Sequence, residues 1–287
     1  MQCYHKITLK NGNVVPCGKC PACRANERSE WIFRLKQEFN ASTFAIFVTL
    51  TYDDEHVPKG FNVCKRDVQL FHKRLRKHFP SRDLRYYVIS EYGDHTFRPH
   101  YHGLYFFSHD YNKDFIYQVF SDSWQQGFIK FGEVEEGSIV YCTKYCLKRS
   151  QIPEGRTNCF RLVSKMNGGL GISYLNKMRD YHVSTFNLNA VYSDGERSRM
   201  PRYYQSQIIK QFDNIDTIVN YNKHREAFIN DIIDSAYEDS LSRFKEFCKL
   251  HKGLSYAEMC IAFNESESRR HNQRDELIEK HCKKQKL

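Results

Sequence analysis

The chain has 287 residues, of which 40% are hydrophobic and 15% aromatic, so it can bury a sizeable core. A mean hydropathy of −0.68 and the lack of an apolar run of roughly 18–20 residues exclude a membrane span. No signal peptide is visible, so we expect a cytoplasmic protein. The formal net charge of +10 favours a polyanionic partner such as DNA or RNA, although many basic proteins bind neither.

Residues 1–25 form a cysteine-rich head whose spacing predicts a metal site. The chain has 11 cysteines, and without an export signal we expect them to be reduced, which favours metal binding or burial over disulfides. Zinc takes four ligands, and the head offers the four sulfurs of Cys3, Cys17, Cys20 and Cys23. His5 is a substitute for Cys3. An iron–sulfur cluster is the alternative, although Glu27 stands at the next position of a ferredoxin-type run.

Apolar residues at helical spacing predict helices, and β-branched or alternating segments predict strands. The predicted helices span residues 24–39, 67–79, 112–125 and 138–149, and the predicted strands span residues 44–52, 85–92, 100–107 and 128–134. Within the first strand, Phe47, Thr49 and Thr51 should share one face. The glycine-rich residues 167–171 predict a loop. Helical spacing resumes beyond residue 205, and the strongly charged C-terminal end is expected to fray or be disordered.

His100 and His102 lie two residues apart in a predicted strand, so both imidazoles should project from one face. A short connection joins this strand to the strand at 85–92, which favours an antiparallel pair with Glu91 facing the histidines. Two histidines and a carboxylate, with open positions for water and phosphate, suit Mg²⁺ or Mn²⁺. The alternative is a pair of exposed strand histidines beside a solvated carboxylate.

Tyr141, Tyr145 and Lys148 recur at helical spacing on one face of the helix predicted at 138–149, with Lys144 beside them. Tyrosine has an ordinary pKa of about 10 and is a poor nucleophile at neutral pH. Adjacent lysines and a metal-bound phosphate would favour the phenolate. Because the chain has 19 tyrosines, aromatic packing on an amphipathic helix is the alternative.

Basic side chains occur along the helices predicted at 24–39 and 67–79, and Arg82, Arg85 and Arg98 add to them. Such side chains can follow a phosphate backbone. For any one of these residues, an ordinary solvated position is the alternative.

A threonine-rich strand, a His-x-His strand and a tyrosine-bearing helix follow one another in an order that resembles the HUH endonucleases, which start rolling-circle replication. The three family motifs are matched by residues 47–51, 98–103 and 141–148. More narrowly, the chain resembles the replication initiators of gokushovirus-type microviruses. Three further segments carry that resemblance: the cysteine head at 16–23, the glycine-rich segment at 169–175 and the Pro-Arg-Tyr-Tyr element at 201–204.

The resemblance implies an α+β fold in which helices pack on an antiparallel sheet of the RNA-recognition type. It also implies that Glu91, His100 and His102 hold Mg²⁺ or Mn²⁺ against a phosphate at a phage origin. One tyrosine would attack, leaving a 5′-phosphotyrosine link and a free 3′-hydroxyl. The second tyrosine would cut the regenerated origin, so that the displaced strand closes into a circle.

The domain carrying this activity is expected at residues 26–204, between the head at 1–25 and a helical C-terminal region at 205–287. The expected partner is origin DNA, single-stranded at the nick, in the cytoplasm of a bacterial host. The chain lacks a Walker-type phosphate loop, so we expect unwinding to come from elsewhere. Host helicase and polymerase are the further expected partners. The alternatives are a relaxase or transposase of the same superfamily, or a non-catalytic nucleic-acid-binding protein with a zinc head.

Overall fold

The computed structural model of the chain describes residues 3–80, 82–93, 95–144, 152–166, 168–192, 195, 197–210 and 214–284. The chain divides into two units, one made of Arg24–Asn176 and the other of Met1–Cys23 with Lys177–Lys284. The domain boundaries predicted at residues 25 and 204 stay predictions, because a compact unit need not coincide with a functional domain. Among the described helices, none has the combination of length and apolar character that a bilayer crossing demands.

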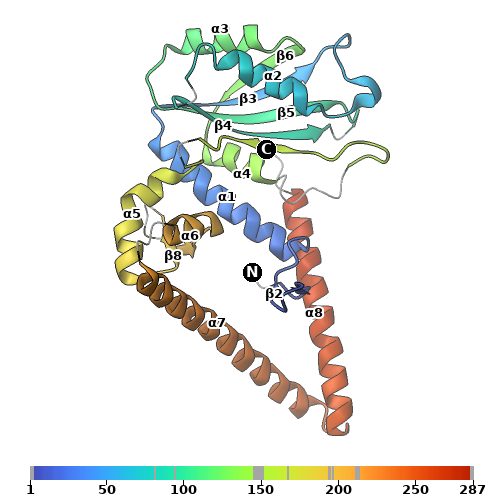
Figure 1. Cartoon of the computed structure of the whole chain (residues 1–287). Helices are drawn as coiled ribbons and strands as arrows, with labels where there is room; N and C mark the ends of the chain where they lie inside the picture. Colours follow the sequence, from blue (N-terminus) through green and yellow to red (C-terminus); the bar gives the residue numbers. More distant parts are fainter. Residues whose placement is uncertain are drawn as a thin grey trace. The chain divides into compact units, whose positions relative to one another are not determined.

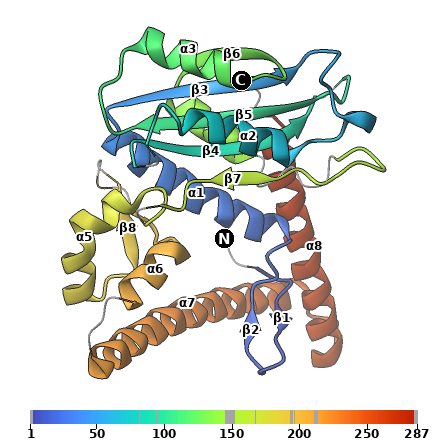
Figure 2. The same ribbon diagram turned by 45° about the horizontal axis from the view of Figure 1, so that its top comes forward.

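A five-stranded antiparallel sheet in the order β6-β3-β5-β4-β7 forms the centre of the unit Arg24–Asn176 (Figures 1 and 2). Its strands are β3 (Phe44–Tyr52), β4 (Leu84–Tyr92), β5 (Pro99–Phe107), β6 (Gly127–Glu133) and β7 (Arg161–Val163). Its helical elements are α1 (Pro21–Ala41), the 3₁₀ turn η1 (Lys59–Phe61), α2 (Lys65–Leu75), α3 (Lys113–Ser123), α4 (Glu136–Lys144) and the start of α5 (Ile172–Thr185). The predicted α+β class with a central antiparallel sheet is confirmed.

The alternation in β3 determines which side chains enter which layer. One set is at most 2% exposed and packs with α2 and α3 on one face of the sheet: Ile46, Val48, Leu50 and Tyr52. Phe47, Thr49 and Thr51 alternate with this set and point to the opposite face, as predicted. On that second face α1 and α4 pack on the sheet through Leu35 and Ile139.

Gly103 permits the tight packing of the central strand β5. A Cβ atom at this position would lie 2.4 Å from a ring carbon of Tyr105. The Tyr105 ring, fully buried, therefore occupies the space that a side chain at 103 would need. Gly103 directly follows His102, so the position that must lack a side chain is next to a predicted metal ligand.

α2 ends at Leu75, four residues before the predicted end at residue 79. Beyond it the chain continues in turns, in which the backbone N–H of Phe79 donates to the Leu75 carbonyl oxygen. Pro80 follows and cannot continue a helix, because it lacks an N–H. Phe79 is fully buried although it lies outside the helix. Its apolar side chain therefore continued the helical spacing in the sequence beyond the end of α2.

The other unit holds two small sheets, the rest of α5 and three further helices among its described residues. These are β1 (Ile7–Thr8) with β2 (Val14–Val15), β8 (Asn189–Val191) with β9 (Arg197–Arg199), α6 (Arg202–Ile209), α7 (Ile215–Leu250) and α8 (Tyr256–Lys284). Arg243 of α7 bonds Glu267 of α8 at 3.0 Å. α8 is helical to Lys284, where the sequence predicts fraying or disorder; pairs such as Glu267 with Arg270, three residues apart, support the helix.

Candidate metal and tyrosine site

Glu91, His100 and His102 meet on one face of the sheet, where β4 pairs with β5. Glu91 stands directly opposite His100 in the antiparallel register, and His102 lies two residues farther along β5 on the same face. The hairpin pairing predicted from the short 93–98 connection is therefore confirmed, and so is the position of Glu91 across from the histidines.

The three side chains point their ligand atoms at one another. Oε2 of Glu91 lies 3.4 Å from Nε2 of His100 and 3.2 Å from Nε2 of His102, and one ligand atom from each residue falls within a 4.8 Å group. Glu91 and His102 are each 7% exposed, whereas His100 is half-buried. Two imidazoles and a carboxylate in this arrangement fit a divalent cation with open positions toward solvent.

The other ring nitrogen of each histidine is held by a second partner. Nδ1 of His102 lies 3.1 Å from the Thr49 hydroxyl oxygen, and Nδ1 of His100 donates across 3.1 Å to the Arg98 carbonyl oxygen. Outer partners of this kind set the tautomer and the ring orientation of a ligating histidine. Because a carbonyl oxygen can only accept, Nδ1 of His100 carries the proton and its Nε2 lone pair faces Glu91. The Thr49 hydroxyl orients the His102 ring.

Tyr141 is the tyrosine that the structure places at these ligands. Its hydroxyl lies 3.2 Å from Nε2 of His102 and 3.3 Å from Oε2 of Glu91. Phe47 of β3 holds both rings, stacking on His102 with 7° between the planes and meeting Tyr141 edge-on. α4 thus delivers a phenol directly to the cation site.

The remaining residues of the predicted tyrosine helix divide into two groups. Tyr145 and Lys148 lie outside the described residues. Lys144, at the end of α4, is 4% exposed. Cys142 beside Tyr141 is fully buried, and burial raises the pKa of its thiol, as does the charge of Glu91. The thiol therefore stays protonated at neutral pH and does not compete with the phenol as a nucleophile.

Thr49 and Phe47 are the site residues to which sequence reasoning gave no role at the metal site, although both fall in the first family motif. The alternation in β3 placed them on the correct face. Their contact with His102 follows from the pairing of β3 with β5, in which Thr49 stands opposite His102. The sequence contains no local signal for that pairing, because it joins strands about 50 residues apart.

Two of the arginines expected to follow a phosphate backbone have other partners. Arg85 is half-buried and pairs with Glu38 of α1 at 3.0 Å. Arg98 pairs with Asp54 at 2.7 Å and donates to the Tyr52 carbonyl oxygen. Both side chains tie elements of the fold together, whereas Arg82 is largely exposed.

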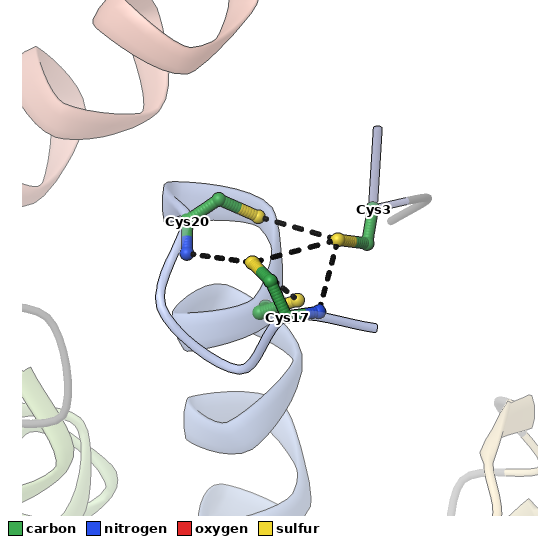
Figure 3. Close-up of side chains that lie close together, drawn as sticks. Cys3, Cys17 and Cys20 are labelled. Carbon is green, nitrogen blue, oxygen red and sulfur yellow. Dashed lines mark hydrogen bonds between the residues drawn. The ribbon is translucent and has the colours of Figure 1, made fainter. Parts of the chain in front are cut away.

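A second group of metal-ligand residues lies in the head, separate in sequence from the first. Figure 3 shows the sulfurs of Cys3, Cys17 and Cys20 turned toward one another, and Cys23 completes the group at the start of α1. Sγ of Cys3 lies 3.7 Å from that of Cys17 and 3.7 Å from that of Cys20, and Sγ of Cys17 lies 4.0 Å from that of Cys23. All four are free thiols. The four predicted ligands are thus brought together.

These sulfur separations fit a single tetrahedral ion. Zn–S bonds of about 2.3 Å in a tetrahedron place the sulfurs about 3.8 Å apart. Sγ of Cys17 accepts from the backbone N–H groups of Lys19 and Cys20, at 3.4 and 3.3 Å. These donors, that of Lys19 foremost, lower the pKa of the Cys17 thiol to about 6. The turn around Gly18 therefore favours a thiolate before any metal binds.

Comparison with known proteins identifies the family. Residues 45–150 match a family model of replication-associated proteins, the one described by the name ORF2. The chain is 30% identical over 263 residues to replication-associated protein VP4 of Bdellovibrio phage phiMH2K, covering 84% of this chain and 82% of that protein. It is 28% identical over 222 residues to replication-associated protein ORF2 of Spiroplasma virus 4, covering 69% and 68%. No solved structure gives a significant match. The chain belongs to the phage replication-associated proteins of the microvirus type.

Proposed function

We propose that this chain starts phage DNA replication by nicking one DNA strand at the origin and later rejoining the displaced strand into a circle. One observation carries the proposal: the Tyr141 hydroxyl lies within 3.3 Å of ligand atoms from both Glu91 and His102. A nucleophile and a cation site in contact are what phosphoryl transfer from DNA to a tyrosine requires.

The geometry supports the following first step. Glu91, His100 and His102 would hold Mg²⁺ or Mn²⁺, which would polarise the scissile phosphate and take up its developing negative charge. Tyr141 loses its proton to solvent, its oxygen forms a bond to phosphorus, the bond from phosphorus to the 3′-oxygen breaks, and the leaving 3′-oxygen takes up a proton from solvent. The products are a 5′-phosphotyrosine link and a free 3′-hydroxyl, so the phosphodiester energy is conserved for rejoining.

Tyr145 is the proposed second nucleophile, four residues after Tyr141 in the chain, and this assignment rests on the sequence. After one round of synthesis it would cut the regenerated origin. The freed 3′-hydroxyl would then attack the first phosphotyrosine link and close the circle. Lys144 and Lys148 are proposed to favour the phenolates. DNA at the phage origin is the proposed partner.

We infer that the four cysteines of the head bind structural Zn²⁺. The sulfur separations of 3.7–4.0 Å support a single tetrahedral ion. Four protein ligands leave no open position, so the site would stabilise the head and would not take part in catalysis. Elemental analysis of the purified protein tests this: one zinc and no iron per chain supports the assignment, and iron with sulfide contradicts it.

An adduct assay tests the nuclease. Full-length protein is incubated with labelled origin strands and Mn²⁺, and covalent protein–DNA complexes are separated on a denaturing gel. Wild type should form the adduct, and the double variant Tyr141→Phe with Tyr145→Phe should not. Tyr181→Phe is the matched control, because Tyr181 is a partly exposed tyrosine outside the site.

The metal ligands are tested in the same assay. His100→Ala and His102→Ala should abolish nicking and leave DNA binding largely intact, because binding is spread over many basic contacts. Equal loss of binding and cleavage contradicts the metal assignment. If wild type forms no adduct with any origin-containing strand, the alternative of a non-catalytic nucleic-acid-binding protein replaces the proposal.

A further inference from the structure

The face of the sheet that carries the cation site continues to the edge strand β6 (Figure 2). Thr51 of β3 pairs with His100 on one side and with Phe128 on the other. Thr49 likewise pairs with His102 and with Lys130. Side chains at directly paired positions of an antiparallel ladder lie on the same face. Phe128 and Lys130 therefore share the face of the metal ligands, two strands away.

Phe128 is exposed in a way that packing does not explain. Its side chain is 67% exposed, more than any other described aromatic residue of the unit Arg24–Asn176. The alternate residues of the same strand, Ile129 and Phe131, pack against the core on the opposite face. An uncovered phenylalanine on an edge strand favours association with another molecule.

Lys130 supplies a positive charge beside Phe128, and these two residues with Thr49 and Thr51 form a strip on this face of the sheet. Lys130 is exposed and follows Phe128 by two residues. The threonines of β3, half-buried, lie between this pair and the histidines. With strands roughly 4.8 Å apart, Phe128 and His100 are separated by roughly 10 Å across the sheet. The strip therefore presents a ring, an ammonium group and hydroxyls beside the proposed position of the scissile phosphate.

We propose that Phe128 stacks on a nucleobase next to the scissile phosphate and that Lys130 pairs with a neighbouring backbone phosphate of the same single strand. The position of the scissile phosphate rests on the proposed function. An aromatic face and a nearby cation are the two elements by which proteins hold single-stranded DNA. The strip holds the strand in line with Tyr141, so Phe128 and Lys130 are positioning residues for the nicking reaction.

Fluorescence anisotropy of the full chain, without added divalent metal, tests the contact. The probes are fluorescein-labelled single strands that tile the phage genome, and the tightest-bound one is used throughout. Phe128→Ala should weaken binding about 10-fold, as expected for loss of one base–aromatic stack. Phe128→Trp should keep the affinity, and Phe128→Leu should bind as weakly as Phe128→Ala, because leucine is apolar but cannot stack.

Two further variants separate charge and general exposure from stacking. Lys130→Gln should weaken binding and reduce the slope of log affinity against log salt by about 0.7, the value for one lost phosphate contact on a single strand. The matched control is Phe115→Ala, an exposed phenylalanine of α3, on the opposite side of the sheet, which should bind like wild type. Unfolding midpoints of all variants should match that of wild type.

The outcomes distinguish this inference from the proposed function. Nicking by wild type with unchanged binding by Phe128→Ala overturns the inference and leaves the nuclease standing. If wild type forms no adduct, but Phe128→Ala and Phe128→Leu bind DNA more weakly and Phe128→Trp binds it like wild type, the nuclease is overturned and the single-strand contact is supported. If Phe128→Ala binds DNA like wild type but converts a dimer into a monomer, the strip pairs two copies of this chain and the inference is wrong.

Discussion

Replacing Thr49 by valine should weaken divalent-cation binding at Glu91, His100 and His102 by roughly 10- to 100-fold, although Thr49 touches no ion. Valine has nearly the shape of threonine and also favours strands, so β3 should form normally. A methyl group would replace the hydroxyl oxygen that lies 3.1 Å from Nδ1 of His102. The imidazole would lose the hydrogen-bond partner of Nδ1 that orients its ring.

The magnitude follows from the burial of His102. The residue is 7% exposed, so water cannot easily replace the lost partner. A buried polar group left without a hydrogen bond costs about 1–3 kcal/mol, which corresponds to roughly 5- to 150-fold in affinity. This range agrees with the effect of removing outer partners from known metal-ligating histidines.

Titration of the purified full chain with Mn²⁺, followed by electron paramagnetic resonance of the free ion, measures the affinity. Thr49→Ser should restore it, because serine keeps the hydroxyl. Thr51→Val is the matched control, because Thr51 lies on the same face of the same strand but donates to the Phe128 carbonyl oxygen. Equal Mn²⁺ affinity for Thr49→Val and wild type, or an equal loss in Thr51→Val, refutes the orienting role.

Three further predictions concern stability. Burial, with a smaller effect of Arg76, lowers the pKa of His72 to about 3. Between about pH 6.5 and pH 3 the imidazole is therefore protonated in the unfolded chain and neutral in the folded chain. Urea unfolding should show the free energy of unfolding falling from pH 6.5 toward pH 3 by up to about 1.4 kcal/mol per pH unit. His72→Gln should flatten that dependence, and an unchanged slope contradicts it. Tyr101→Phe should cost about 1–3 kcal/mol in the same assay, because its hydroxyl bonds both backbone groups of Cys64; unaltered stability counts against that network. Cys20→Ser should release the zinc and lower the melting temperature without changing Mn²⁺ affinity, and a coupled loss of both metals argues against separate sites.

Periodicity and local connections were sufficient for much of the candidate site. The alternation in β3 predicted that Phe47, Thr49 and Thr51 share a face. The short connection before His100 implied an antiparallel hairpin. Such a hairpin places Glu91 opposite the histidines through local pairing alone, without contacts from other elements. The cluster of cysteines at 17–23 was likewise a local pattern.

The charged C-terminal helix and the end of α2 show where local patterns misled. Charge density suggested fraying or disorder over the last 20 residues, but α8 continues to Lys284, and the Tyr4 ring of the head stacks on His271 and lies under the Arg274 guanidinium. At α2, the buried Phe79 continued the apolar spacing after the helix had ended. At α8, contacts with a segment distant in the sequence determined the outcome.

By itself, the sequence determined which residue types can do the chemistry and which face of each strand they occupy, because side-chain direction follows from the two-residue repeat of a strand. Only the tertiary structure decided which elements are neighbours. The insertion of β3 between β5 and β6 brings Thr49 to His102 and places Phe128 on the face of the cation site, and the packing of α4 brings the Tyr141 hydroxyl to Glu91. These contacts depend on burying both faces of one sheet at once, a condition that no local segment of the chain expresses.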